Sequence, residues 1–83
     1  MTVRIHHHAE QRAIERGAEK TEIINTVENG EQFPAKYSRT GFRKNFPFNS
    51  KRNTKQYSTK QIEAYCVKQD DDWLVITVLV KYF

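Results

Sequence analysis

The chain contains a single cysteine, Cys66, so no internal disulfide can form and no zinc site can be built from several cysteines. No apolar run approaches the ~18 residues that span a bilayer, and the N-terminus lacks the apolar segment of a signal peptide. Neither GxGxxG nor GxxxxGK[ST] occurs, and 83 residues are too few for a separate nucleotide-binding domain. We therefore expect one cytoplasmic domain over residues 1–83, with a small core and with no membrane contact, cofactor or metal. Cys66 is expected in the core.

Acidic residues are also absent from the 31 positions between Glu31 and Glu63, which carry eight Lys and Arg residues. The overall net charge of +4 understates this asymmetry. A surface of one sign attracts polyanions, and aromatic residues between the cations can stack on unpaired bases. The alternative is a solubilised sheet edge whose aromatic residues belong to the core. We expect this basic segment to bind RNA or DNA through Lys36, Arg39, Arg43, Lys44, Lys51, Arg52 and Lys55.

The order of the elements predicts an α+β domain with two N-terminal helices packed on a three- to four-stranded antiparallel sheet. Nothing interrupts a helix over 7–16, where Gly17 is a suitable stop, and a second helix is expected from an N-cap at Thr21 to a left-handed stop at Gly30. Strands are expected at 35–37, 42–46 and 61–69, with a loop over 49–59 and a turn at 70–72.

The final segment, 73–83, is the most apolar part of the chain. Strict alternation places Leu74, Ile76, Val78, Val80 and Tyr82 on one face, and Trp73, Val75, Thr77, Leu79 and Lys81 on the other. Apolar residues on both faces predict a strand inside the sheet, paired on each side. Thr77 is the one residue of this strand with an aliphatic hydroxyl. It either has a structural role or points into a substrate groove.

His8, Arg12 and Arg16 recur every four residues and form one stripe on the first helix. Guanidiniums can bind phosphate oxygens, and an imidazole exchanges protons near neutral pH, so the stripe suits chemistry at a phosphodiester. The alternative is a solvated helix face in which glutamates offset the arginines. His6 and His7 are expected at the surface and not as metal ligands.

The segment His8-Ala9-Glu10-Gln11-Arg12-Ala13-Ile14-Glu15-Arg16-Gly17, followed by Thr21-Glu22-Ile23-Ile24, resembles the opening H-A-x-x-R-x-x-x-R-G of a bacterial family of unknown function. The ending Val75-Ile76-Thr77-Val78 is similar to the closing strand of the same domains. This family is related to BrnT and to the RelE/ParE toxin superfamily, so the resemblance implies a RelE/barnase-like fold.

The same resemblance implies metal-independent cleavage of RNA, in which the 2′-hydroxyl attacks its own phosphate. It implies that His8 is the general base or acid, that Arg12 and Arg16 bind phosphate, that Thr77 hydrogen-bonds the phosphate and that Arg43 contacts the RNA backbone. The basic segment offers no carboxylate base of the kind that barnase-like members use.

Three functions follow as hypotheses. The first is a ribonuclease toxin that cleaves mRNA or tRNA and is neutralised by an acidic antitoxin or immunity protein, which would cover the basic surface. The second is a non-catalytic nucleic-acid-binding module, and the third is a ParE-like toxin that inhibits a protein target. Met1 favours a free-standing gene over the C-terminal piece of a delivered toxin.

Overall fold

The computed structural model describes residues 2–83 and has two helices and five strands. The helices are α1 (His7–Glu15) and α2 (Lys20–Asn29). The strands are β1 (Val3–Ile5), β2 (Glu31–Pro34), β3 (Thr40–Arg52), β4 (Lys55–Gln69) and β5 (Asp72–Tyr82), and their order across the sheet is β1-β5-β4-β3-β2. β1 is parallel to β5, and every other neighbouring pair is antiparallel.

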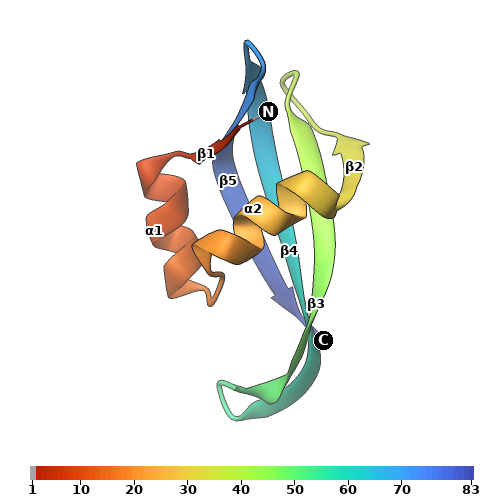
Figure 1. Ribbon diagram of the computed structural model, residues 1–83. Coiled ribbons are helices and arrows are strands. Elements are labelled where there is room, and N and C mark those ends of the chain that lie inside the picture. Colours follow the sequence, from red (N-terminus) through yellow and green to blue (C-terminus); the bar gives the residue numbers. More distant parts are fainter. Residues whose placement is uncertain (1) are drawn as a thin grey trace.

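The α+β class is therefore confirmed, but the sheet is mixed and has five strands where three or four antiparallel strands were predicted. β1 escaped prediction because three residues are too few to show alternation. Figure 1 shows α2 crossing the front of the sheet, while α1 lies beside the β5 edge. The opposite face of the sheet carries no helix.

Helix α1 follows the predicted boundaries closely. Its N-cap is His6, whose Nδ1 accepts a hydrogen bond of 3.2 Å from the backbone N–H of His8. It ends at Glu15 with Arg16 as its C-cap, and Gly17 follows with a φ of +96°, which glycine adopts at little cost. Ala9 and Ala13 are buried, and their small side chains allow the helix to lie close to β5.

Helix α2 begins two residues earlier than predicted, since its N-cap is Glu19 instead of Thr21. The side chains of Glu19 and Glu22 form a reciprocal capping box that satisfies free amides of the first turn. Gly30 ends the helix with φ −82° and ψ 173°, so the predicted left-handed stop is wrong. Ile23, Thr26 and Val27 form the buried side of α2, at the spacing of a helix face.

Two predictions in the middle of the chain are also wrong, the strand at 35–37 and the loop over 49–59. Residues 35–39 form a loop between β2 and β3, whereas 35–37 was predicted as a strand. Residues 49–59 are mostly strand, because β3 continues to Arg52 and β4 begins at Lys55. The turn between them, Asn53-Thr54, has two left-handed residues but no glycine to mark it in the sequence. This hairpin curls away at the bottom of Figure 1 and lengthens the molecule to 42 Å.

Strand β5 is paired on both sides, as predicted, although β1 covers only residues 73–75. Its faces differ from strict alternation because Tyr65 pairs with Thr77 while Cys66 pairs with Val75. Ile76 is therefore the extra residue of a β-bulge. The bulge directs both Val75 and Val78 into the core and leaves Thr77 exposed.

The core lies between the helices and the front of the sheet. Phe42 of β3 packs edge to face on Trp73, with ring centroids 5.2 Å apart. Cys66 is fully buried in this core, as expected. The main buried members are Ala13, Ala18, Ile23, Val27, Phe42, Ile62, Ala64, Cys66, Val75 and Val78.

Candidate functional site

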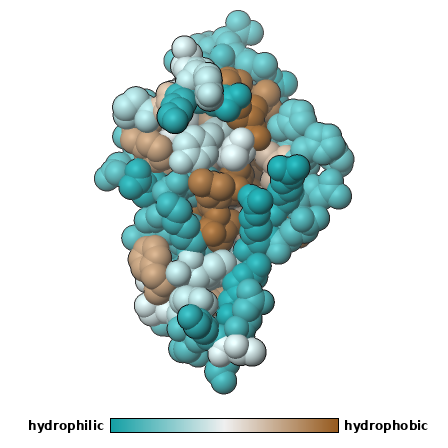
Figure 2. Space-filling model, turned by 180° about the vertical axis from the view of Figure 1, so that it is seen from behind, coloured by the Kyte–Doolittle hydropathy of each residue, from teal (hydrophilic) through white to brown (hydrophobic). Residues whose placement is uncertain are grey.

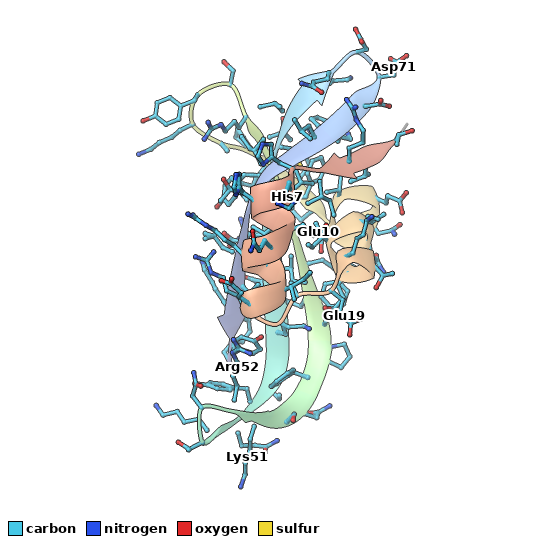
Figure 3. All side chains as sticks on the ribbon, turned by 90° about the vertical axis from the view of Figure 1, so that its left-hand side faces the viewer. His7, Glu10, Glu19, Lys51, Arg52 and Asp71 are labelled. Atoms are coloured by element: carbon cyan, nitrogen blue, oxygen red, sulfur yellow. The ribbon has the colours of Figure 1, made fainter. Side chains whose placement is uncertain are left out.

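The face of the sheet opposite the helices is exposed and carries the candidate site. Figure 2 shows an apolar strip running down the middle of this face, with hydrophilic surface on both sides. The β2–β3 loop projects on this side, opposite to α2 (Figure 3). We call this surface the open face; it bears the side chains of β3, β4 and β5 that point away from the core.

The predicted helix stripe and the predicted threonine come together at one edge of the open face. His8, Arg12 and Arg16 from α1 line a small hollow of about 80 Å³ with Thr77 of β5. These side chains are exposed, so a ligand can reach them. α1 lies against the edge of β5 because β1 ends at Ile5 and leaves the edge beyond residue 75 for the helix.

Arg16 also has a structural contact in this hollow. Its Nη1 donates a 3.0 Å hydrogen bond to the backbone carbonyl of Val78, which lies beyond the part of β5 that β1 covers. The hydroxyl of Tyr82 in turn donates a 2.6 Å hydrogen bond to the carbonyl of Arg16. The guanidinium has further N–H donors for a phosphate, but its first contact fastens α1 to the sheet.

Thr77 connects this hollow to a larger one. The larger hollow has a volume of about 610 Å³ and lies between the β2–β3 loop and the open face. Its lining combines aromatic rings with the cations Lys36 and Arg39. Because Thr77 lines both hollows, the two form neighbouring parts of one surface.

Glu63 is the centre of a charge cluster that the sequence did not reveal. Only 7% of its side chain is exposed, yet it lies on the open face among polar groups from three strands. Its Oε1 accepts a 2.9 Å hydrogen bond from the hydroxyl of Tyr65, and its Oε2 accepts one of 3.3 Å from Lys81 Nζ. Arg43 Nε lies 3.7 Å from the same Oε2, so two cations face one carboxylate.

The pKa of Tyr65 is raised from its ordinary value by burial and then by the hydrogen bond and charge of Glu63, against a lowering effect of Arg43. The phenol is therefore a hydrogen-bond donor at neutral pH. Arg43 Nε is buried without a hydrogen-bond partner in the described residues, and its guanidinium lies 4.4 Å from the ring centroid of Phe33. Arg43 is thus positioned on the open face with unused donor capacity.

The seven predicted nucleic-acid contacts do not form one patch. Lys36 and Arg39 line the larger hollow, and Arg43 belongs to the Glu63 cluster. Lys44 pairs in register with the fully buried Ile62, so strand alternation turns it toward the helix side. The remaining three belong to the β3–β4 hairpin: Lys51, Arg52 and Lys55.

The hairpin cations lie at the end of the molecule opposite to the β2–β3 loop (Figure 1). Lys51 points away from the body in Figure 3, whereas Arg52 points toward the C-terminal end of α1. Arg52 Nη2 donates to the carbonyl of Glu15 at 3.3 Å, and its guanidinium lies 4.9 Å from the centroid of the Tyr82 ring. Arg52 therefore fastens the hairpin to α1.

Most aromatic residues of the basic segment pack within the protein. Phe33 packs edge to face on Tyr65, and Phe48 on Tyr82. Tyr37 is different, since 82% of it is exposed at the tip of the β2–β3 loop. Most of these aromatic residues therefore have a packing role, as the alternative interpretation of the basic segment predicted. Tyr37 is available to a ligand.

His6 and His7 are exposed, as expected, and His6 also caps α1. Among residues 2–83, no group of three or more His, Cys, Asp or Glu side chains is arranged to hold a metal ion. Neither helix in this part of the chain has the length and apolar character needed to cross a membrane.

A family model described as a domain of unknown function (DUF4258) matches residues 5–80, and the chain belongs to this family. The match covers both helices and the candidate site. No curated protein and no solved structure shows a significant match to the chain. The match confirms that the chain belongs to a domain family of unknown function, as the resemblance implied. A relationship to BrnT or RelE stays a prediction.

Proposed function

We propose that the protein is a small endoribonuclease of the toxin type, with a RelE/BrnT-like fold, that cleaves RNA without a metal ion. The observation that carries this proposal is the hollow shared by His8, Arg12 and Thr77. An imidazole, a guanidinium and a hydroxyl from two distant parts of the chain face one exposed space. This combination suits a phosphodiester, because it offers one proton-transfer group and two groups that bind phosphate oxygens.

In the proposed reaction the RNA 2′-oxygen attacks the adjacent phosphorus. The new P–O2′ bond forms as the P–O5′ bond breaks, giving a cyclic phosphate and a 5′-hydroxyl. One proton leaves the 2′-hydroxyl and one reaches the departing 5′-oxygen. His8 takes part in one of these transfers, while Arg12 and the Thr77 hydroxyl stabilise the charge that develops on the phosphate.

The open face supplies the binding surface for the rest of the strand. Arg43 and Lys81 carry two positive charges against the single negative charge of Glu63, so this cluster retains a net positive charge. Glu63 acts as a positioning residue in this proposal, because its carboxylate already accepts from Tyr65 and Lys81. An acidic antitoxin or immunity protein that covers the open face would block the RNA and neutralise the toxin.

The test is incubation of the purified protein with total bacterial RNA in EDTA, with products resolved on a gel and their ends identified chemically. We expect discrete fragments with cyclic-phosphate ends, and we expect His8→Ala to abolish them. His7→Ala is the matched control, since His7 is also exposed on α1 but does not line the hollow. Arg12→Ala should lower the cleavage rate by ~10²-fold, within the range for loss of one charge-stabilising donor.

Three outcomes contradict the proposal in different ways. RNA that is bound but never cut identifies a non-catalytic binding module. Equal loss of cleavage in His7→Ala and His8→Ala would assign the effect to the helix N-terminus and not to proton transfer. Absence of both cleavage and RNA binding would favour a ParE-like protein directed at another protein.

A further inference from the structure

The β2–β3 loop holds an exposed aromatic residue beside the larger hollow. The loop closes on itself, because the N–H of Ala35 donates to the carbonyl of Arg39 at 3.0 Å and the N–H of Arg39 donates to the carbonyl of Lys36 at 3.3 Å. Its two central residues, Tyr37 and Ser38, have φ values of +61° and +59°. Turns with two left-handed residues usually contain asparagine, aspartate or glycine at these positions, so Tyr37 is an unfavourable choice for the turn itself.

The position of Tyr37 is more easily explained by a ligand than by packing. Its ring is 82% exposed, and it lines the hollow together with Tyr65 and Phe33. Left-handed backbone at a bulky residue is costly and is concentrated at binding sites. The internally hydrogen-bonded turn fixes the backbone of Tyr37 and presents its exposed ring as a stacking surface.

The inner wall of the hollow is held by packing. The ring of Phe33 lies directly over Gly41, where a Cβ atom would collide with it, and the Arg43 guanidinium covers the ring from 4.4 Å. Tyr65 packs edge to face on Phe33 and is oriented by its hydrogen bond to Glu63. The hollow therefore has an aromatic inner wall and an aromatic rim.

Charge decides which planar ligand fits. Lys36 and Arg39 lie on the loop that carries Tyr37, and none of the residues that line the hollow is acidic. The volume of about 610 Å³ lies within the ~300–1,000 Å³ typical of small-ligand sites. An unpaired base that stacks on an exposed aromatic ring, with its phosphates beside cations, satisfies both kinds of lining group.

We propose that the hollow between the β2–β3 loop and the open face binds one unpaired nucleobase of a single-stranded RNA, with Tyr37 stacked on the base and Lys36 and Arg39 beside its flanking phosphates. This site deepens the proposed function, since Thr77 joins the hollow to the space lined by His8 and Arg12. A base held here fixes which phosphate of the strand lies next to His8. The substrate class is then single-stranded RNA, selected against duplexes whose bases are stacked internally.

The test measures binding of a labelled single-stranded RNA to the full chain carrying His8→Ala, which prevents cleavage during the titration. Tyr37→Ala in this background should weaken binding about tenfold, the usual loss for one stacked base. Tyr37→Phe should bind like the parent, because stacking needs the ring and not the hydroxyl. Phe83→Ala is the control, since Phe83 is an exposed aromatic residue that follows the last residue of β5 and does not line the hollow.

Strands with a single abasic position, moved along the RNA, identify the contact directly. For the parent protein, one abasic position should lower the affinity by about as much as Tyr37→Ala does. For the Tyr37→Ala protein, the same strand should bind no more weakly than the intact RNA. The proposal is overturned if every abasic strand binds equally, if duplex RNA binds as tightly as single strands, or if Tyr37→Ala leaves the affinity unchanged.

The wild-type cleavage assay separates this proposal from the one on which it rests. Cleavage that depends on His8, with no effect of Tyr37 on binding, removes the base site and keeps the ribonuclease. Binding that depends on Tyr37, with no cleavage by the wild type, keeps the base site and removes the ribonuclease. If the protein binds no RNA, both proposals fail.

Discussion

Lys60 Nζ lies 2.8 Å from Glu22 Oε1, and this ion pair joins the middle of β4 to the first turn of α2. The same ammonium donates a 2.9 Å hydrogen bond to the carbonyl of Gly17, in the segment between the two helices. Only 9% of the Lys60 side chain is exposed. One cation of the basic segment is therefore a structural anchor that fixes the helices to the sheet and so positions α1 beside the open face.

Lys60→Ala should lower the free energy of unfolding by ~2–3 kcal/mol, at or just below the range for breaking a buried pair, because Glu22 keeps some contact with water. Urea unfolding followed by circular dichroism measures this loss. Lys68→Ala is the control, since Lys68 lies on the same strand but is exposed, and its removal should cost less than ~1 kcal/mol. Equal losses in the two variants would refute the anchoring role.

Tyr65 should contribute to the pH dependence of stability. Burial and Glu63 raise its pKa in the folded state, so the folded protein holds the phenolic proton more tightly than the unfolded chain. The resulting stability is complete below the unfolded pKa of ~10 and is lost as the pH rises through the higher folded value.

Tyr65→Phe should therefore be less stable than the wild type by ~1–2 kcal/mol near pH 7, because Glu63 Oε1 loses its donor. The difference should shrink as the pH rises above ~10. Unfolding measured by urea across this interval tests the prediction, with the exposed Tyr37→Phe as control. A difference that stays constant with pH would contradict the coupling of Tyr65 to Glu63.

The sequence predicted those elements of the fold whose boundaries are marked by neighbouring residues in the chain. α1 was predicted well because an uninterrupted segment and Gly17 define it. The β3–β4 hairpin was missed because its Asn53-Thr54 turn adopts left-handed backbone without glycine, and because polar strands that extend beyond the core show no apolar alternation. The alternation predicted for β5 holds on each side of Ile76 but not across it, since a bulge is set by pairing with β4 and leaves no mark in β5 itself.

In the candidate site, too, the residues marked by a local pattern were predicted, and those that depend on contacts between strands or on turn geometry were missed. The stripe of His8 and Arg12 follows from helical spacing. Thr77 was identified by its hydroxyl in an apolar strand, and the resemblance implied its contact with phosphate. Glu63 was missed because it is a single carboxylate in a strand, and its importance comes from partners on neighbouring strands. Tyr37 was counted with the other aromatic residues, since only the turn geometry separates it from those that pack inside.

Cys66 should be chemically inert in the folded protein. It is fully buried, and burial raises the pKa of its thiol to about 12, so the reactive thiolate is scarce at neutral pH. Labelling by a soluble thiol reagent should be slower than in the unfolded chain by ~10³-fold or more, a factor set by the unfolding equilibrium. With an aromatic disulfide as the reagent, the absorbance of the aryl thiolate that it releases measures the reaction with and without denaturant. Rapid labelling of the native protein would contradict the buried position of the thiol.

Glu63→Gln should strengthen binding of single-stranded RNA and make it more sensitive to salt. The substitution removes the negative charge that faces Arg43 and Lys81 and so frees both cations for phosphates. Each additional phosphate contact steepens the slope of log K against log salt by ~0.7 for a single strand, so an increase of up to ~1.4 is expected. Titrations at several salt concentrations in the His8→Ala background measure the slope.

Glu28→Gln makes the same change of charge at an exposed position on α2, and it should leave the slope nearly unchanged because α2 covers the opposite face of the sheet. An equal response in both variants would mean that net charge, and not the open face, governs the interaction with RNA.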